Sequence, residues 1–187
     1  MHQIKEQLME NPVIAAVKEE RALEGALQSD CEVVFLLSST VLNVAQQVER
    51  VKQAGKTVLV HMDLVEGLSN REIAVDALAQ LCHPHGIIST RPTQVRRARH
   101  LGLVTVQRAF ILDSMSITSL HGQISVGKPD FIEILPGIMP RVISEITSQT
   151  QIPLIAGGLI KHKEEVLDAI KAGALAVSTT CQAVWDM

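Results

Sequence analysis

Small polar residues follow two apolar runs near the C-terminal end of the chain. The run IPLIAG ends beside Gly157 and Gly158, and the run ALAVST leads into Ser178, Thr179 and Thr180. Glycine lets backbone N–H groups approach an anion closely, and hydroxyl groups donate further hydrogen bonds. Parallel α/β proteins bind phosphate at the carboxyl ends of such strands. The two segments therefore predict a phosphate site.

Charged or titratable side chains stand near the ends of other apolar runs: His61, Asp63, Arg91, Arg108 and Glu133. Side chains alternate along a strand, so polar groups of one parity on apolar strands are expected to face the same end of the sheet. One interpretation is a structural ring of ion pairs, in which the acids Asp63 and Glu133 pair with the arginines Arg91 and Arg108. The other is a ligand site, in which the arginines bind an anion and the acids accept from hydroxyls.

The same residues do not form a recognisable metal site or an activated nucleophile. His61 and Asp63 resemble half of a metal-ligand pair, but a catalytic metal site needs about three protein ligands. No G-x-S-x-G motif is present. Lys18, directly after the run PVIAAV, is the nearest candidate for a Schiff-base lysine, and we include it among the expected ligand-binding residues. We therefore predict no catalytic residues, no metal and no cofactor.

A basic segment lies in the middle of the chain. Residues 77–112 hold five arginines and no Asp, Glu or Lys, although the whole chain carries a net charge of −3. A helix over Pro92–Leu101 would turn Val95, Ala98 and Leu101 inward. The residues left outside, Arg96, Arg97, Arg99 and His100, are a candidate footprint for an RNA backbone. The alternative is a solvated helix face without a partner.

Eight short apolar runs must position these residues. Each is followed by a helix-like stretch, which indicates βα units and a parallel sheet. Eight such units favour a compact (β/α)8 TIM-type barrel, with an open doubly wound sheet as the alternative. We expect one domain over residues 12–187, preceded by an N-terminal extension over residues 1–11. The runs are Pro12–Val17, Val33–Leu37, Lys56–Asp63, Gly86–Thr90, Leu103–Arg108, Asp130–Leu135, Ile152–Gly157 and Ala174–Thr179.

The composition agrees with this architecture and excludes other classes. Hydrophobic residues make up 47% of the chain and aromatic residues 2%, as expected for a core of branched aliphatic side chains. Three widely spaced cysteines do not suggest a disulfide framework. The charged start and the lack of a long apolar run argue against a signal peptide and a membrane span. We expect a cytoplasmic protein, and a homo-oligomer is compatible with the sequence.

Six motifs together resemble the glycerol uptake operon antiterminator regulatory proteins, over Asn11–Trp185. The resemblance implies a (β/α)-barrel regulator that responds to glycerol 3-phosphate and acts on leader mRNA of glycerol-use genes to prevent termination. Pro92 and the pair Thr180-Cys181 differ from the family pattern. The motifs are LVHMDLVEGL, GIISTR, QRAFILDS, KPDFIEILPGIMP, IPLIAGGLI and AVSTTCQAVW.

Two other functions fit the same residues. The first is an enzyme acting on a small sugar phosphate, an isomerase or a lyase, with Glu133 or His61 as the general base. The second is a barrel that binds a phosphorylated metabolite but no nucleic acid. A barrel fold alone does not separate these alternatives from a regulator.

Overall fold

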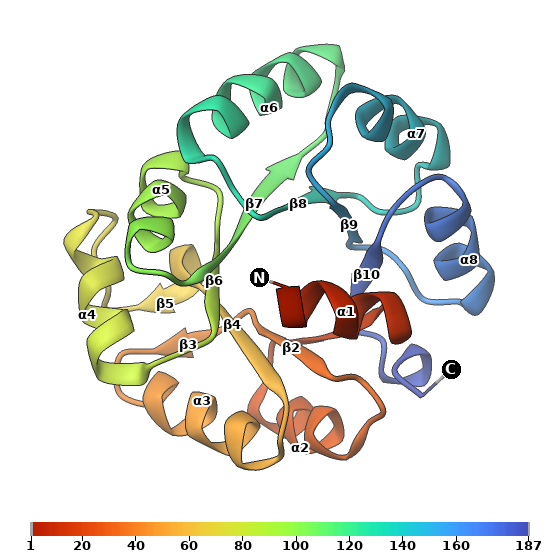
Figure 1. Cartoon of the computed structure of the whole chain (residues 1–187). Helices are drawn as coiled ribbons and strands as arrows, with labels where there is room; N and C mark the ends of the chain where they lie inside the picture. Colours follow the sequence, from red (N-terminus) through yellow and green to blue (C-terminus); the bar gives the residue numbers. More distant parts are fainter. Residues whose placement is uncertain (1, 187) are drawn as a thin grey trace.

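The computed structural model describes residues 2–186 and shows a closed barrel of eight parallel strands (Figure 1). The strands follow one another around the barrel in chain order, and β1 closes the ring by pairing with both β2 and β10. The predicted (β/α)8 barrel is therefore confirmed. The strands are β1 (Val13–Val17), β2 (Val33–Leu36), β4 (Thr57–His61), β6 (Gly86–Ser89), β7 (Val104–Phe110), β8 (Phe131–Leu135), β9 (Leu154–Gly157) and β10 (Ala176–Thr179).

Helices surround the barrel and connect each strand to the next (Figure 1). After β10, the last strand, the chain forms the short 3₁₀ helix η2. The connecting helices are α2 (Glu20–Gln28), α3 (Val44–Gln53), α4 (Ile73–Cys82), α5 (Pro92–His100), α6 (Ser114–Gly127), α7 (Pro140–Gln149), α8 (Lys163–Lys171) and η2 (Gln182–Val184).

Alternation along the strands divides the core into two regions. Residues of one parity, such as Phe35, Leu59 and Phe131, fill the inside of the barrel. Residues of the other parity, such as Val60 and Ile132, pack between the strands and the helices. Both sets are almost fully buried, so an apolar residue is needed at nearly every strand position.

Helix α5 forms where the sequence predicted it, with one difference on its buried face. Pro92 occupies its first turn, where a missing N–H costs little, and the helix ends before Gly102, whose φ is +79°. Val95 and Ala98 are fully buried, but Leu101 is 39% exposed, so its predicted inward orientation is wrong. Leu101 lies past the last helical turn and no longer follows the helical spacing.

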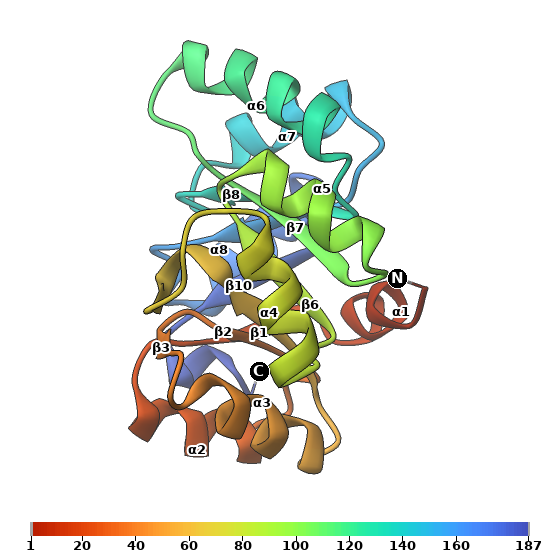
Figure 2. The ribbon, with the colours of Figure 1, turned by 90° about the vertical axis from the view of Figure 1, so that its left-hand side faces the viewer.

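The N-terminal segment forms the helix α1 (His2–Glu10), which covers the amino end of the barrel (Figure 2). Its Ile4 and Leu8 are buried against the interior residues of the barrel, including Val33 and Phe131. The expected extension is therefore part of the hydrophobic core and seals one end of the barrel.

A second, smaller sheet lies at the opposite end. The strands β3 (Ser39–Thr40) and β5 (Val65–Glu66) pair in parallel, next to the 3₁₀ helix η1 (Met62–Leu64). Figure 2 shows β3 at the end of the barrel away from α1. This pair of strands was not predicted from the sequence, and it shapes one side of the barrel mouth.

Within residues 2–186, none of the helices combines the length and the apolar character that crossing a bilayer would require.

We predict that Leu8→Ala destabilises the protein by about 2–5 kcal/mol, because it leaves a cavity between α1 and the barrel interior. Met9→Ala is the control, since Met9 lies on the same helix but is 67% exposed, and we expect a change below about 0.5 kcal/mol. Urea unfolding measures both. Equal effects of the two substitutions would contradict a role for α1 in sealing the barrel.

Candidate functional site

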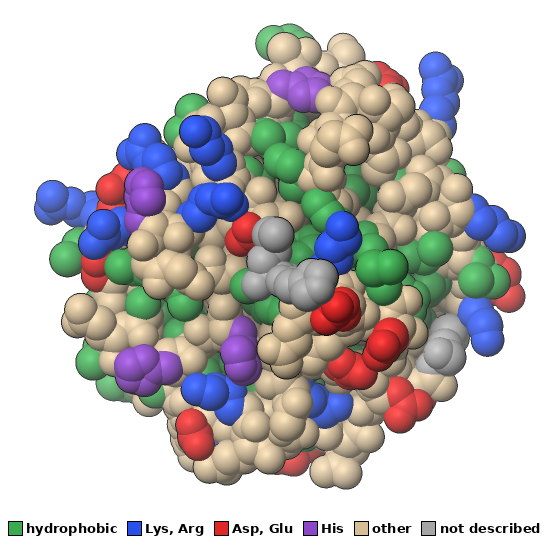
Figure 3. All heavy atoms as spheres, in the orientation of Figure 1, with side chains coloured by type: hydrophobic (Ala, Val, Ile, Leu, Met, Phe, Trp, Pro, Cys, Tyr) green, Lys and Arg blue, Asp and Glu red, His purple; other side chains and the backbone are tan. Residues whose placement is uncertain are grey.

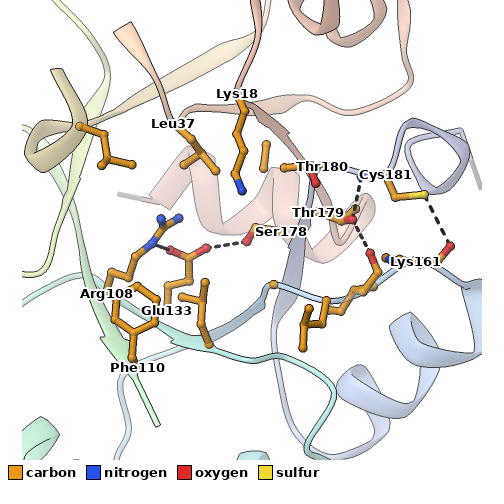
Figure 4. Close-up of a pocket in the computed structure, with 16 residues that line it drawn as sticks. Lys18, Leu37, Arg108, Phe110, Glu133, Lys161, Ser178, Thr179, Thr180 and Cys181 are labelled. Carbon is orange, nitrogen blue, oxygen red and sulfur yellow. Dashed lines mark hydrogen bonds and ion pairs between the residues drawn. The ribbon is translucent and has the colours of Figure 1, made fainter. Parts of the chain in front are cut away.

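The carboxyl end of the barrel holds a cavity of about 580 Å³ (Figure 4). Its walls come from the ends of β1, β7, β8, β9 and β10 and from the loops that follow β2 and β4. The helix α1 closes the amino end of the barrel, whereas the cavity opens to solvent at the carboxyl end.

A buried ion pair forms the base of the cavity. Arg108 on β7 and Glu133 on β8 are direct partners in the strand register, and Arg108 Nε donates to Glu133 Oε2 over 2.6 Å. Ser178 donates its hydroxyl to the other oxygen, Oε1. Glu133 is fully buried and the Arg108 side chain is 6% exposed. Gly157 leaves the space for this cluster, since a Cβ there would lie 2.7 Å from Glu133 Oε1 and from Ser178 Oγ.

Three cationic residues line the cavity, and one of them, Lys161, was not among the residues predicted from the sequence. Of the three guanidinium nitrogens of Arg108, only Nε has a partner among residues 2–186. The ammonium group of Lys18 has no partner among these residues. Figure 4 shows Lys18 entering the cavity from β1 with its nitrogen directed toward Ser178. Lys18, Arg108 and Lys161 carry three positive charges, and Glu133 is the one acidic residue among those that line the cavity. The cavity therefore favours an anion.

Backbone donors lie at the same cavity. Gly158 and Leu159, directly after β9, both have positive φ angles, +78° and +63°. In the described part of the chain, no acceptor is found for the backbone N–H groups of Gly158, Leu159 and Thr180. All three residues line the cavity. Successive N–H groups in such a turn commonly bind anions.

The structure divides the predicted ligand-binding residues into two groups. Seven of them line the cavity, namely Lys18, Arg108, Glu133, Gly158, Ser178, Thr179 and Thr180. His61, Asp63, Arg91 and Gly157 do not line it. The Thr179 hydroxyl is already engaged, because it donates to the Ile160 carbonyl and accepts from the Cys181 N–H.

Asp63 lies in a separate polar network beside β6. Its carboxylate accepts from the hydroxyls of Ser89 and Thr90, from the Thr90 N–H, and from Arg91 over 2.7 Å. Burial alone would raise the pKa of Asp63, but the hydrogen bonds from Thr90 and Ser89 outweigh it and hold the pKa below its ordinary value. Both predicted acid–arginine pairs are present, Asp63 with Arg91 and Glu133 with Arg108. The first pair lies outside the cavity, as the structural ion-pair interpretation expects.

His61 is buried at the end of β4 and 3% exposed. Burial, together with the nearby charge of Arg108, lowers its pKa to about 4, and its Nδ1 has no hydrogen-bond partner in the described chain. His61 is therefore a neutral side chain at neutral pH, and it is poorly placed to exchange protons with a ligand in the cavity.

The cavity also has an apolar wall that was not predicted from the sequence, and it includes Leu64, Phe110, Leu135 and Leu159. Phe110 and Leu135 are the last residues of β7 and β8 and lie opposite each other in the register. Their position at the ends of strands could have predicted this, because residues at strand ends border the barrel mouth whether they are polar or apolar.

The arginines of the basic segment are neutralised by acids from neighbouring elements. Arg96 pairs with Glu72, Arg97 with Asp76 and Arg99 with Asp130. The segment itself contains no acids, but acids from outside it pair with these arginines: they lie just before α4, within α4 and just before β8. Figure 3 shows the basic side chains gathered over α5 with acidic ones among them.

No group of three or more His, Cys, Asp or Glu side chains among residues 2–186 is arranged to hold a metal ion.

The family model for the glycerol-3-phosphate responsive antiterminators matches residues 13–185. The chain belongs to this family. The matched region covers the whole barrel, from the first strand to the helix that follows the last one. The resemblance inferred from the six motifs is therefore confirmed.

Relatives of this antiterminator-family chain support the assignment. The Escherichia coli K12 protein YgcP, which is uncharacterized, is 41% identical over 180 residues, or 96% of this chain and 94% of YgcP. The glycerol uptake operon antiterminator regulatory protein of Listeria monocytogenes is 36% identical, with a TM-score of 0.90 and 94% and 95% of the two chains covered. A glycerol uptake operon antiterminator-related protein of Thermotoga maritima is 32% identical, with a TM-score of 0.82, and covers 94% and 98%.

We predict that His61 makes the stability of this family member depend on pH. A histidine with a lower pKa in the folded than in the unfolded state binds fewer protons when folded, so stability falls as the pH falls below about 6.5. From the pKa of about 4, His61 accounts for a loss on the order of 2 kcal/mol between pH 7 and pH 5.

Urea unfolding at both pH values measures this loss, and His61→Met removes the titrating group. The variant should lose distinctly less stability than the wild type on acidification. An exposed histidine, His121→Gln, serves as the control and should behave like the wild type. An unchanged pH dependence in His61→Met would show that His61 is not held neutral by burial.

Proposed function

We propose that this antiterminator-family chain binds glycerol 3-phosphate in the barrel cavity and, in response, acts on leader mRNA of glycerol-use genes. One observation carries the ligand part of the proposal. Lys18 and Arg108 present unpaired donors to a cavity in which a single buried carboxylate offsets only one of their charges. The family description and the name of the Listeria relative support the regulatory part.

A phosphate group suits the space between these donors. Charge-assisted hydrogen bonds from an ammonium and a guanidinium are the strongest that side chains make to a phosphate oxygen. The backbone N–H groups of Gly158, Leu159 and Thr180 add neutral donors on the β9 and β10 side. Glu133 accepts from Arg108 and Ser178 and so holds the guanidinium of Arg108 in place for the phosphate.

The same contacts favour a regulator over an isomerase or a lyase. A general base needs a carboxylate or imidazole free to take a proton from the ligand. Glu133 is committed to Arg108 and Ser178, and His61 does not line the cavity. Neither of the two groups that the sequence offered as a general base is therefore free to take a proton from a ligand in the cavity.

We predict that Lys18→Met weakens glycerol 3-phosphate binding at least about tenfold, because a hydrogen bond to a charged group contributes about 1.5–3 kcal/mol. Lys163→Met is the control, since Lys163 is an exposed lysine that does not line the cavity. Titration calorimetry measures both variants, with glycerol and inorganic phosphate as comparison ligands. Absence of binding at millimolar glycerol 3-phosphate, or equal affinity of Lys18→Met and wild type, would contradict the proposed site.

The enzyme alternative is tested on the same samples. Phosphorus NMR of glycerol 3-phosphate and of triose and pentose phosphates, followed over hours with the protein present, should show unchanged ligand. Turnover that disappears in Glu133→Gln would favour the enzyme.

RNA contact is proposed for the outer face of α5, through Arg96, Arg97, Arg99 and His100. Because the three arginines are ion-paired, a phosphate backbone must compete with Glu72, Asp76 and Asp130 for them. Arg96 is the most available, since its contact with Glu72 is 3.3 Å long and both side chains are nearly half exposed.

The pair Arg96–Glu72 therefore gives two opposite predictions for leader RNA. Arg96→Gln should weaken binding several-fold and reduce the slope of log K against log salt by about 0.7–0.9, as expected for one lost phosphate contact. Glu72→Gln should strengthen binding, because it frees Arg96.

Filter binding or fluorescence anisotropy at three salt concentrations measures both, with Arg141→Gln on α7 as the control. Identical RNA affinity in all variants would remove α5 from the RNA interface and favour a phosphate-binding barrel that contacts no nucleic acid through this helix.

A further inference from the structure

Lys161 is a cation at the cavity that the proposed function leaves without a role. It lies in the loop between β9 and α8, the loop that also carries the backbone N–H groups of Gly158 and Leu159. Its side chain is exposed, and its ammonium group makes no hydrogen bond or ion pair among residues 2–186. The cavity therefore has a third positive charge that is free to meet a ligand.

The backbone of Lys161 is held in place from two sides, although its side chain is free. Its N–H donates to Glu165 over 2.6 Å, and its carbonyl accepts from the Cys181 thiol over 3.6 Å. The same Glu165 oxygen also accepts from the His162 N–H, as part of the capping of α8. These contacts fix the point from which the Lys161 side chain starts and leave its charge unused.

The three cations of the cavity are spread along one arc of the barrel. Arg108 comes from β7, Lys161 from the loop after β9, and Lys18 from the end of β1. Around the ring the strands run β7, β8, β9, β10 and β1, so one strand separates each cation from the next. Neighbouring strands lie about 4.8 Å apart, and the long side chains of Lys and Arg can therefore converge on one small group.

The charges of the residues that line the cavity match a phosphate group with two negative charges. Three cations and one carboxylate, that of Glu133, leave an excess of two positive charges. A phosphomonoester carries about −1.5 to −2 at pH 7 and has three terminal oxygens, one for each cation. A phosphodiester or a sulfate monoester carries only one negative charge and would leave one positive charge without a partner.

Acids in a neighbouring cavity change this balance little. Lys18 also lines that cavity, together with Glu19, Asp63 and Glu66. Arginines already pair with Glu19 and Asp63. Glu66 is exposed, and water weakens its interaction with Lys18.

We propose that Lys161 is a third phosphate-binding residue and that the site selects dianionic phosphomonoesters over monoanionic phosphodiesters and sulfate esters. This inference rests on the proposed function for the position of the phosphate, and it adds the residue and the charge that determine specificity. A regulator with such a site responds to glycerol 3-phosphate and not to phosphodiesters of glycerol, whose phosphate must first be freed by hydrolysis of one ester bond.

Methyl phosphate and methyl sulfate test the charge selection, because they have nearly the same shape and differ by one charge at pH 8. Titration calorimetry of the full chain in phosphate-free buffer of low ionic strength measures both affinities. Methyl phosphate should bind at least about tenfold more tightly than methyl sulfate. Equal affinities, or the absence of methyl phosphate binding, would overturn the proposal.

Lys161→Met isolates the role of the third cation. A unit charge about 4 Å from an ammonium in water changes affinity about fivefold, so the ratio of the two affinities should fall about fivefold. Lys161→Arg keeps the charge and should retain most of the ratio. Lys163→Met is the matched control, since Lys163 is also exposed, lies two residues away and does not line the cavity. An unchanged ratio in Lys161→Met would also overturn the proposal.

The failure of this inference and that of the proposed function are distinguishable. Binding of glycerol 3-phosphate, with equal affinities for methyl phosphate and methyl sulfate, leaves the proposed function intact and removes the charge selection. Preferential binding of methyl phosphate that depends on Lys161, without measurable binding of glycerol 3-phosphate, supports the charge selection and contradicts the glycerol ligand.

Discussion

The ion pair between Arg108 and Glu133 inside the barrel is the interaction on which the site depends. Removing two charges from water is costly, and only close geometry with additional hydrogen bonds compensates for it. The strand register supplies the geometry by placing the two residues opposite each other, and Ser178 supplies the further hydrogen bond. Gly157 must lack a side chain for the cluster to fit. Because Nε of Arg108 is held by Glu133, its terminal nitrogens keep a fixed orientation and stay available to an anion.

The barrel itself was predictable because its signal is repeated eight times. Each run of branched aliphatic residues forms a strand that is buried on both sides, and each helix ends near a glycine or polar residue that the sequence displays. The helix α1 gave no comparable signal, since within Gln3–Glu10 only Ile4 and Leu8 are buried. The pair β3–β5 has two residues in each strand, which is too short for any alternation to appear.

The site was predictable in part, for a related reason. Parity along the strands brought Arg108 and Glu133 to one end of the barrel, and the position of Ser178 at the end of an apolar run placed it there too. It could not show which polar groups satisfy one another, because partners lie far apart in the sequence. The acids that neutralise the arginines of α5 are 21 to 31 residues away, on elements that only the closed barrel brings alongside. Asp63 likewise accepts hydrogen bonds from Thr90 and Arg91, which lie on a neighbouring element, and these bonds occupy its carboxylate.

The central claim is that Lys18 and Arg108, which both line the cavity, hold the phosphate of a phosphate ester. A crystal structure of the protein grown with glycerol 3-phosphate tests it most directly. The account predicts phosphate oxygens within hydrogen-bond distance of Lys18 Nζ and of a terminal nitrogen of Arg108, with Glu133 and Ser178 unmoved. A phosphate bound elsewhere on the protein, with these nitrogens contacting only solvent, would contradict it.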